Sequence, residues 1–291
     1  MKIFLAGASG QLGLALQVAL GEHDVIAAGH DMFDITRLDH VRNLLGKACP
    51  DLVINAAAYT DVDGAESDQV RAYQVNALGP RNLAKATADL QIPLVHISTD
   101  YVFNGAECSP YHEFDCPSPQ SVYGLSKLAG EEAVRGINPR HYVVRTAWLF
   151  HTVGRNFLKT MCSMATRPEV RVVSDQFGSP TYAPHLADAL SQVIMREPFG
   201  TYHLAGKGGT SWFELTRTLY CKLGIKTPVK PVSTAEFPRA AQRPKYSVLT
   251  SLQNPLIQLP SWEEGVKAFV KQVGSSTLKR DKMTQQTERA A

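Results

Sequence analysis

Tyr123 and Lys127 are the two residues whose types and spacing point most directly to a reaction. They lie four positions apart in Tyr-Gly-Leu-Ser-Lys, which places the phenol and the ammonium on one face of a helix. A tyrosine with an ordinary pKa of about 10 holds its proton firmly, whereas a nearby ammonium favours the phenolate and makes the phenol a better acid. Such a pair can give a proton to a carbonyl oxygen while that oxygen gains negative charge.

The Tyr–Lys pair is not specific by itself. In a chain with ten tyrosines, about 0.5 matches to Tyr-x-x-x-Lys are expected by chance, and an ordinary helix-surface pair has the same spacing. Further hydroxyls follow the apolar run Leu94–Ile97, namely Ser98 and Thr99. The carboxyl end of a parallel strand is where open α/β sheets bind ligands, so Thr99 can hold a carbonyl oxygen there. The alternative is a strand end whose hydroxyls bond their own backbone.

A glycine-rich turn follows the first apolar run of the chain. Gly7, Gly10 and Gly13 are spaced G-x-x-G-x-x-G, with Ser9, Gln11 and Leu12 between them. A turn of this kind brings backbone close to a pyrophosphate, whose charge then sits on the free N–H groups of a helix N-terminus. The sequence therefore predicts a dinucleotide site, the alternative being an ordinary tight turn between a strand and a helix.

The second apolar run, Val25–Ala28, ends in Gly29-His30-Asp31. Residues at this position distinguish NAD from NADP. A carboxylate here binds the ribose hydroxyl of NAD, whereas a cation binds the 2′-phosphate of NADP. His30 suits a phosphate and Asp31 a ribose, so the pattern favours NADPH without excluding NADH. Asp34 is suited either to the adenine amino group or to capping a helix that begins near Leu38.

Short apolar runs alternate with helix-length segments in the first half of the chain. This rhythm predicts a parallel sheet covered by helices on both faces. The expected strands are Lys2–Ala6, Asp24–Ala28, Leu52–Asn55, Leu94–Ile97 and His141–Arg145. The expected helices are Gln11–Leu20, Asp39–Ala48, Glu66–Leu90 and Val122–Val134. Beyond Asn156 the pattern loosens into short runs such as Val170–Val173 and Gly200–Leu204 between proline-rich connections, which predicts a smaller lobe.

Composition limits the classes of function. A formal net charge of +3 without a basic block argues against nucleic-acid binding. Five cysteines without a Cys-x-x-Cys pair fit a reducing cytoplasm and argue against a zinc site. The apolar start of the chain is too short for a signal peptide or a membrane span, so we expect no membrane association.

Several motifs in fixed order resemble the extended short-chain dehydrogenase/reductase family, most closely its dTDP-4-dehydrorhamnose reductases. The resemblance covers roughly residues 1–270. Its motifs are Gly7–Gly13, Asn55–Thr60 with Asp63 and Glu66, Val75-Asn76, Ser98–Phe103, Tyr123–Lys127, Arg145–Trp148, Asn156-Phe157 and Asp175–Thr181.

The resemblance implies an α/β fold: a Rossmann-type doubly wound parallel sheet with a smaller C-terminal α/β substrate lobe. We expect an NAD(P)-binding domain over residues 1–155, with later elements returning to the sheet, a substrate-binding lobe mainly over 156–273, and a disordered polar tail over 274–291. The implied reaction is reduction of the C4 keto group of a dTDP-4-keto-6-deoxy sugar, foremost dTDP-4-dehydrorhamnose, by a cytoplasmic monomer or homodimer. The alternatives are a reductase or epimerase of another 4-keto nucleotide sugar, and a non-catalytic NADP-binding regulatory subunit.

The resemblance also implies roles for individual residues. Thr99, Tyr123 and Lys127 form the catalytic set, with Asn76 supporting the proton relay. Residues expected at the cofactor are Gly7, Ser9, Gly10, Gln11, Leu12, Gly13, His30, Asp34, Ile35, Ala56, Ala57, Ala58, Thr60, Asn76, Ser98, Tyr123 and Lys127. Residues expected at the substrate are Thr99, Tyr101, Trp148, Asn156, Gln176 and Arg243, the last facing the diphosphate because a planar fork suits phosphate oxygens.

Two departures from the family pattern affect these expectations. Relatives often read Arg-Pro-x-Asn-Ser-x-Leu-Asp late in the chain, where this sequence has Tyr246 in place of Asn and Thr250 in place of Asp. These changes leave the exact sugar and the stereochemistry at C4 open. Some relatives dimerise through Mg²⁺ held by glutamates, but the matching regions here contain Leu14–Leu16 and Ala183–His185. We therefore expect no metal.

Overall fold

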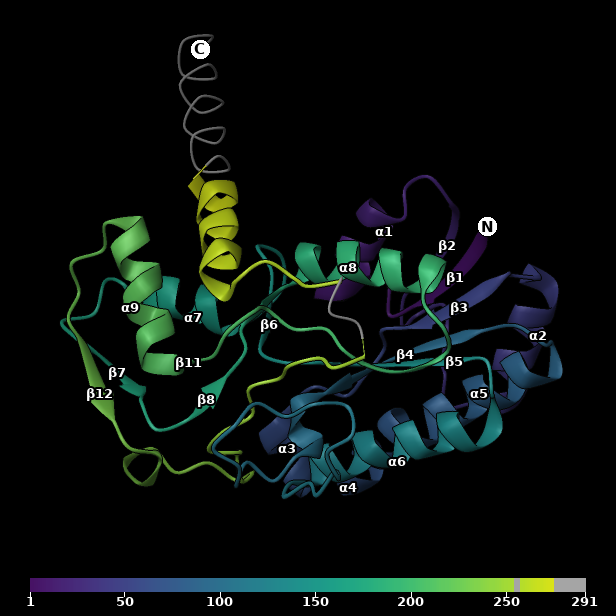
Figure 1. Ribbon diagram of the computed structural model, residues 1–291, viewed down its shortest axis with the longest axis horizontal. Helices are drawn as coiled ribbons and strands as arrows, with labels where there is room; N and C mark the ends of the chain where they lie inside the picture. The colour runs from purple at the N-terminus through teal and green to yellow at the C-terminus, as the bar shows by residue number, and fades with distance from the viewer. Residues whose placement is uncertain (254–256, 275–291) are drawn as a thin grey trace, which may run out of the picture.

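The computed structural model describes residues 1–253 and 257–274. Its largest element is a six-stranded sheet with the order β10-β5-β4-β3-β1-β2, in which every pair is parallel (Figure 1). The strands are β1 (Lys2–Ala6), β2 (Asp24–Ala28), β3 (Leu52–Asn55), β4 (Leu94–Thr99), β5 (His141–Thr146) and β10 (Gly200–His203). The predicted fold class is confirmed, and the five expected strands form, with β4 and β5 running slightly further than expected.

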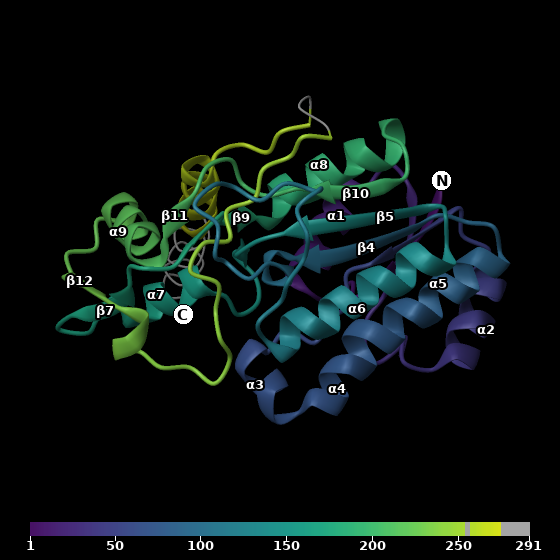
Figure 2. The ribbon, with the colours of Figure 1, turned by 60° about the horizontal axis from the view of Figure 1, so that its bottom comes forward.

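Helices cover both faces of the sheet, as Figure 2 shows. On one face α1 (Gln11–Ala19) packs against α8 (Ala183–Arg196), and on the other α5 (Gly79–Asp89) lies between α2 (Leu38–Ala48) and α6 (Val122–Ile137). Each layer has its own core of buried side chains, one around Leu16 and Leu190 and the other around Phe4 and Leu83. Burial on both faces explains why the strands are apolar without alternation.

The predicted single helix over Glu66–Leu90 is wrong. The chain instead forms α3 (Val62–Ser67), α4 (Gln69–Tyr73), a π-helical turn η1 (Gln74–Leu78) and then α5. Asp68 interrupts the helix because its side chain accepts a hydrogen bond from the backbone N–H of Arg71 and so caps a new helix. Helical periodicity alone does not reveal such a restart.

The strand order places a ligand crevice between β1 and β3. From β1 the chain moves outward to β2, and it then returns to the other side of β1 for β3. Open α/β sheets bind ligands at such a switch point, outside the carboxyl ends of the strands. Ala6, the last residue of β1, lies beside Asn55, the last residue of β3. The glycine turn and the Ala56–Ala58 segment therefore start from adjacent positions.

A second group of elements lies beyond the carboxyl edge of the sheet (Figure 1). It contains the parallel pair β7–β12 and the short pairs β6–β9 and β8–β11. Its elements are β6 (Leu149–Phe150), α7 (Phe157–Met164), β7 (Val170–Val173), β8 (Phe177–Gly178), β9 (Thr181–Tyr182), β11 (Thr210–Ser211), α9 (Trp212–Leu223), β12 (Val229–Val232), η3 (Thr234–Glu236) and a helix over residues 262–274. They share a core around Leu219 and Phe269.

The division of the chain into domains at residues 155 and 273 stays a prediction. After β5 the chain enters the second group of elements, and it returns to the sheet with α8 and β10 before leaving again. The expected polar tail falls almost wholly on residues 275–291, which lie outside the described residues.

Three findings concern the expectations from composition. No helix among the described residues is long and apolar enough to span a membrane. All five cysteines are free thiols. Within residues 1–253 and 257–274, no three or more His, Cys, Asp or Glu side chains gather in a way that could hold a metal ion.

Candidate active site

A cavity of about 880 Å³ lies at the carboxyl ends of the strands. Its wall includes residues from the glycine turn, the ends of β2, β3, β4 and β5, helix α6 and the second lobe. The predicted site residues on this wall are Gly7, Ser9, Gly10, Gln11, Leu12, His30, Asp34, Ile35, Ala56, Ala57, Ala58, Thr60, Ser98, Thr99, Tyr101, Tyr123, Lys127 and Trp148. Segments far apart in the sequence thus meet at one cavity.

The glycine turn is shaped for close approach of backbone. Gly7 has φ +78°, and a Cβ there would lie 2.5 Å from the backbone N of Ala57. A Cβ on Gly13 would lie 2.3 Å from the carbonyl oxygen of Gly7. Only glycine fits either position without moving backbone. Gly10 precedes α1 without a side-chain cap, so the first N–H groups of this helix point outward as an anion site.

Thr99 and Tyr123 lie together on the cavity wall. Thr99 ends β4, where its hydroxyl donates to Asp100 Oδ1 at 3.0 Å and accepts from the backbone N–H of Tyr101 at 3.2 Å. Burial raises the pKa of Tyr123 to about 12, a hydrogen bond with Thr99 acts against this rise, and the charge of Asp100 adds to it. The phenol therefore keeps its proton throughout the physiological pH range.

Lys127 is almost fully buried below the cavity. Its Nζ donates to the carbonyl oxygen of Ile97 at 2.6 Å. Burial lowers the pKa of Lys127 to about 8, although the nearby carboxylate of Glu131 raises it. We expected this ammonium to lower the pKa of Tyr123, but burial raises that pKa, and the group that acts against the rise is Thr99. Of these two groups, Lys127 is the one whose pKa lies closer to neutral pH.

Helix α6, which carries Tyr123 and Lys127, is fixed at several points. Ser121 caps its N-terminus by accepting from the N–H of Gly124 at 3.2 Å. A Cβ on Gly124 would lie 2.3 Å from the carbonyl oxygen of Tyr101, so the helix packs directly on the segment after β4. Further along, Glu131 is fully buried and binds Arg145 of β5 at 2.8 Å and Ser98 of β4 at 2.5 Å.

Two tryptophans form a stacked pair where the second group of elements meets the cavity. The rings of Trp148 and Trp212 are parallel within 3°, with centroids 3.3 Å apart, and Phe157 packs on Trp212 at 4.4 Å. A Cβ on Gly178 would lie 2.3 Å from Trp148 Cε2, so this indole lies directly against a glycine. Trp148 has φ +44°, an uncommon conformation that its surroundings must hold.

Five predicted site residues do not line the cavity: Gly13, Asn76, Asn156, Gln176 and Arg243. Asn76 is buried and bonds both backbone groups of Tyr59 as well as the hydroxyl of Ser126. It therefore holds a cavity-wall residue against α6. Gly13 lies beneath the glycine turn, as its contact with Gly7 requires.

The remaining three residues bind other protein groups. Asn156 caps α7 and donates to Gln11 Oε1 at 2.9 Å. Gln176 is buried and donates to Thr234 Oγ1 at 3.0 Å. Arg243, expected at a diphosphate, makes a two-pronged ion pair with Asp63.

Sequence reasoning missed Trp212 and Thr146, both of which line the cavity. Trp212 begins α9, and nothing local connects it with Trp148. Thr146 lies beside Thr99 in the register of β4 and β5. Its hydroxyl is buried and has no hydrogen-bond partner, which is unusual for a buried polar group. Only the strand pairing identifies this hydroxyl as a candidate ligand contact.

Comparison with known proteins gives consistent matches over nearly the whole chain. Residues 1–275 match the family model of the RmlD substrate binding domain. A dTDP-4-dehydrorhamnose reductase of Mycolicibacterium smegmatis is 42% identical over 287 residues, which is 95% of this chain and 87% of that protein. A probable dTDP-4,6-dihydroxy-2-methyloxan-3-one 4-ketoreductase of Streptomyces antibioticus is 41% identical over 256 residues, 86% of each chain.

The structural match agrees with the sequence matches. A crystal structure of dTDP-4-dehydrorhamnose reductase from Bacillus anthracis, in complex with NADP, superimposes with a TM-score of 0.90 at 41% identity. The match covers 93% of this chain and 99% of the other.

Proposed function

Because the chain belongs to the RmlD substrate-binding-domain family of extended short-chain dehydrogenase/reductases, we propose that it reduces dTDP-4-dehydrorhamnose to dTDP-L-rhamnose with NADPH. The observation that carries this proposal is the placement of Thr99, Tyr123 and Lys127 on the cavity that the glycine turn also lines. A proton donor, an oxygen-binding hydroxyl and a dinucleotide site are the parts that carbonyl reduction requires.

The cavity fits a dinucleotide cofactor. A Cβ on Gly7 or Gly13 would collide with backbone, and the start of α1 offers N–H groups to a pyrophosphate. We assign the pyrophosphate to the Gly7–Leu12 turn and the adenine end to Asp34 and Ile35. His30 lies on the cavity wall whereas Asp31 does not, which supports NADPH over NADH. When bound, the reduced nicotinamide supplies the hydride.

The phenol of Tyr123 supplies the proton, and Thr99 binds the oxygen that receives it. Even with a pKa of about 12, a phenol is a stronger acid than an alcohol, so proton transfer to a newly formed alkoxide is downhill. The Thr99 hydroxyl has one proton, which it gives to Asp100 in this structure. To hold the substrate oxygen it must turn that proton towards the cavity, where it stabilises the developing charge.

The pKa of Lys127 predicts how kcat/KM changes at alkaline pH. Its pKa of about 8 means that the ammonium is present below this pH and is lost as the pH rises through it. We expect kcat/KM to fall about tenfold per pH unit above pH of about 8, because kcat/KM reports essential groups of the enzyme before the substrate binds. A pH–rate profile measured with saturating NADPH tests this. A flat profile up to a pH of about 10 would show that the charge of Lys127 is not required.

A substitution at Trp212 is expected to weaken binding of the sugar nucleotide. We assign Trp148 to the binding of the sugar nucleotide. Replacing Trp212 with alanine removes the ring that stacks on one face of Trp148. We expect KM for the sugar nucleotide to rise about tenfold with little change in kcat, since an aromatic pair contributes about 1 kcal/mol beyond its buried area. Steady-state kinetics measure both constants. Phe213→Ala, on the same helix but away from the cavity wall, is the control and should leave KM unchanged.

One observation favours a second substrate, another dTDP-linked 4-keto sugar. The relative from Streptomyces antibioticus carries such an activity in its name, and Tyr246 and Thr250 depart from the family pattern. However, neither residue lines the cavity. Tyr246 pairs with Phe177, and the N–H of Thr250 donates to the carbonyl of Tyr111. Both departures therefore contact other protein groups away from the cavity wall, which supports dTDP-4-dehydrorhamnose as the substrate.

The decisive experiment follows the loss of NADPH absorbance with a panel of dTDP-4-keto sugars and identifies the product. Turnover of dTDP-4-dehydrorhamnose to dTDP-L-rhamnose with the highest kcat/KM supports the proposal. A higher kcat/KM for another sugar would favour the second substrate. Tight NADPH binding without oxidation by any sugar would favour a regulatory subunit, which has no use for an intact Thr99–Tyr123–Lys127 set.

Two further parts of the proposal concern the setting of the enzyme. We infer that it acts in the cytoplasm, where NADPH and nucleotide sugars are available, and that it works as a monomer or a homodimer. The division into a cofactor domain over residues 1–155 and a mainly substrate-binding lobe over 156–273 belongs to the same proposal. The position of the cavity between the sheet and the second group of elements supports this division.

A further inference from the structure

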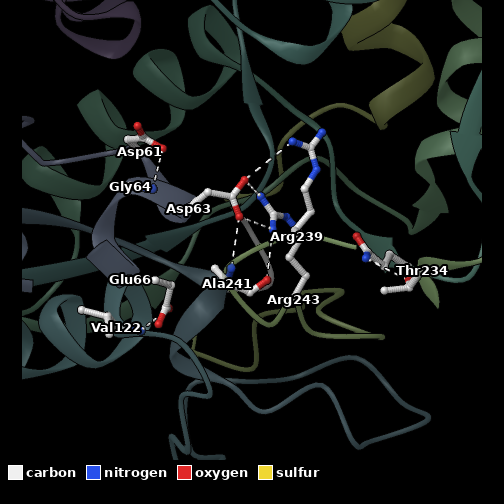
Figure 3. Close-up of polar contacts among 10 residues, drawn as sticks. Asp61, Asp63, Gly64, Glu66, Val122, Thr234, Arg239, Ala241 and Arg243 are labelled. Carbon is white, nitrogen blue, oxygen red and sulfur yellow. Dashed lines mark hydrogen bonds and ion pairs between the residues drawn. The ribbon is translucent and has the colours of Figure 1, made fainter. Parts of the chain in front are cut away.

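Asp63 is the meeting point of several polar contacts from a distant part of the chain (Figure 3). Arg243 donates from Nη1 to Oδ1 and from Nη2 to Oδ2 of Asp63, both at 2.9 Å. The backbone N–H of Ala241 donates to Oδ1 at 3.2 Å, and Arg239 approaches Oδ2 at 3.8 Å. One carboxylate therefore interacts with three residues of the segment 239–243.

The Asp63–Arg243 pair joins the sheet domain to the C-terminal segment. Asp63 lies in α3, the next element after β3, whereas Arg243 follows η3 of the second group of elements. Their side chains are 31% and 20% exposed, while those of the surface pair Arg42–Asp89 are 50% and 58% exposed. A two-pronged, partly shielded pair holds its geometry better than an exposed one.

Arg243 has few donors left for an anionic ligand. Besides its two bonds to Asp63, its Nη1 donates to the carbonyl oxygen of Ala241 at 3.1 Å. Burial would lower the pKa of Arg243, but hydrogen bonds to Asp63 and Tyr101 and the charge of Asp63 raise it. The guanidinium thus already binds the Asp63 carboxylate and one backbone carbonyl, as a structural support does.

The residue that connects this pair to the site is Tyr101. It lines the cavity, and its ring meets that of Tyr123 edge to face, with centroids 5.5 Å apart and planes at 81°. The segment after Arg243 contacts the same region twice more. Ser247 Oγ donates to Asp100 Oδ2 at 2.6 Å, and a Cβ on Gly105 would lie 2.5 Å from Pro244 Cβ.

We propose that Asp63 and Arg243 are positioning residues that clamp the C-terminal segment onto the end of β4 and thereby fix Tyr101 in the sugar-nucleotide part of the site. The proposal rests on the proposed function, because it concerns binding of a dTDP-sugar. It assigns Arg243 a role through Tyr101, in place of the direct contact with the diphosphate that the sequence suggested.

The clamp acts on one half of the cavity. Tyr101 lies beside Tyr123, whereas, among the residues that the structure describes, the polar contacts of Asp63 and Arg243 do not include the glycine turn or the end of β2. Loosening the clamp should therefore weaken binding of the sugar nucleotide and leave NADPH binding unchanged. A general loss of stability would weaken both.

The test compares Asp63→Asn, Arg243→Gln and the double variant. We expect each single variant to raise KM for dTDP-4-dehydrorhamnose and the Kd of dTDP about tenfold, equivalent to about 1.4 kcal/mol. We expect kcat to change less than about threefold, and the Kd of NADPH to stay the same. The double variant should resemble the singles, because the second substitution removes a partner that is already lost. The charge exchange Asp63→Arg with Arg243→Asp should recover part of the affinity.

Two control variants separate the clamp from the loss of any charge. Arg239→Gln removes a more exposed partner of the same carboxylate, and Arg42→Gln breaks the surface pair with Asp89. Both should change KM less than about twofold. Thermal unfolding confirms that each variant folds; should Asp63→Asn not fold, Asp63→Glu and Arg243→Lys replace the two variants and should give smaller shifts in the same direction.

The sign of the effect of Asp63→Asn on dTDP binding decides the proposal. If dTDP binds more tightly while Arg243→Gln weakens it, Arg243 is a diphosphate ligand for which Asp63 competes, and the clamp is wrong. A parallel loss of NADPH affinity, or an unchanged Kd for dTDP, also overturns it. The Kd of dTDP can be measured without turnover. The test of the clamp is therefore independent of the test of the proposed reaction. A wild type that does not reduce dTDP-4-dehydrorhamnose contradicts only the function.

Discussion

Replacing Tyr123 with phenylalanine is expected to lower kcat by about three orders of magnitude, the usual contribution of a positioned general acid. The variant removes one oxygen atom and leaves the aromatic ring, so its edge-to-face contact with Tyr101 remains. Without the phenol, the alkoxide must take its proton from water. Single-turnover loss of NADPH absorbance measures the effect on the chemical step itself.

The Kd of NADPH should be the same in Tyr123→Phe and in the wild type, because we assign the larger part of the cofactor to the glycine turn and the end of β2. Tyr101→Phe is a matched control, since it also deletes one phenolic hydroxyl from the cavity wall. It should alter KM more than kcat. If Tyr123→Phe turns over at a rate close to that of the wild type, another group supplies the proton and the proposed mechanism fails.

Replacing Glu131 with glutamine is expected to have the largest effect on stability, about 3–5 kcal/mol. The carboxylate is fully buried and binds Arg145, which is only 3% exposed, as well as Arg135 and Ser98. Burial alone would raise the pKa of Glu131, but the bonds to Arg145 lower it. The substitution leaves the positive charge of Arg145 buried without its counter-charge, which is costly.

Urea unfolding of Glu131→Gln measures this loss as a lower midpoint with an unchanged slope. The control is Glu214→Gln, which breaks the exposed i,i+3 pair with Arg217 and should change the unfolding free energy by less than about 1 kcal/mol. Because Glu131 ties α6 to β4 and β5, activity should fall as well. A variant as stable as the wild type would show that Arg145 finds another partner, and would remove this network as the anchor of α6.

Together the two variants separate an effect on the reaction rate from an effect on stability within one helix. Tyr123 and Glu131 both belong to α6 and lie about two helical turns apart. The first should change the rate without changing stability, and the second should change stability before it changes the intrinsic rate. This division follows from their surroundings, since Tyr123 faces the cavity and Glu131 faces the sheet.

Elements with a local cause could be predicted from the amino-acid sequence. Apolar runs that are buried on both faces gave the five strands, and their alternation with helices gave the parallel sheet. The glycine spacing was informative because only glycine tolerates a backbone contact such as that between Gly13 and Gly7. The four-residue spacing of Tyr123 and Lys127 placed both on the cavity side of α6, since helical periodicity fixes which residues share a face.

Contacts between distant residues, by contrast, could be found only once the chain was seen folded. Arg243 pairs with Asp63, 180 positions away, and Trp212 stacks on Trp148. The unpartnered hydroxyl of Thr146 becomes visible only through the register with Thr99. The same holds for Lys127, whose low pKa comes from burial and not from its place in a motif. Local sequence fixes torsions and faces, whereas ion pairs, stacking and burial depend on which segments the fold brings together.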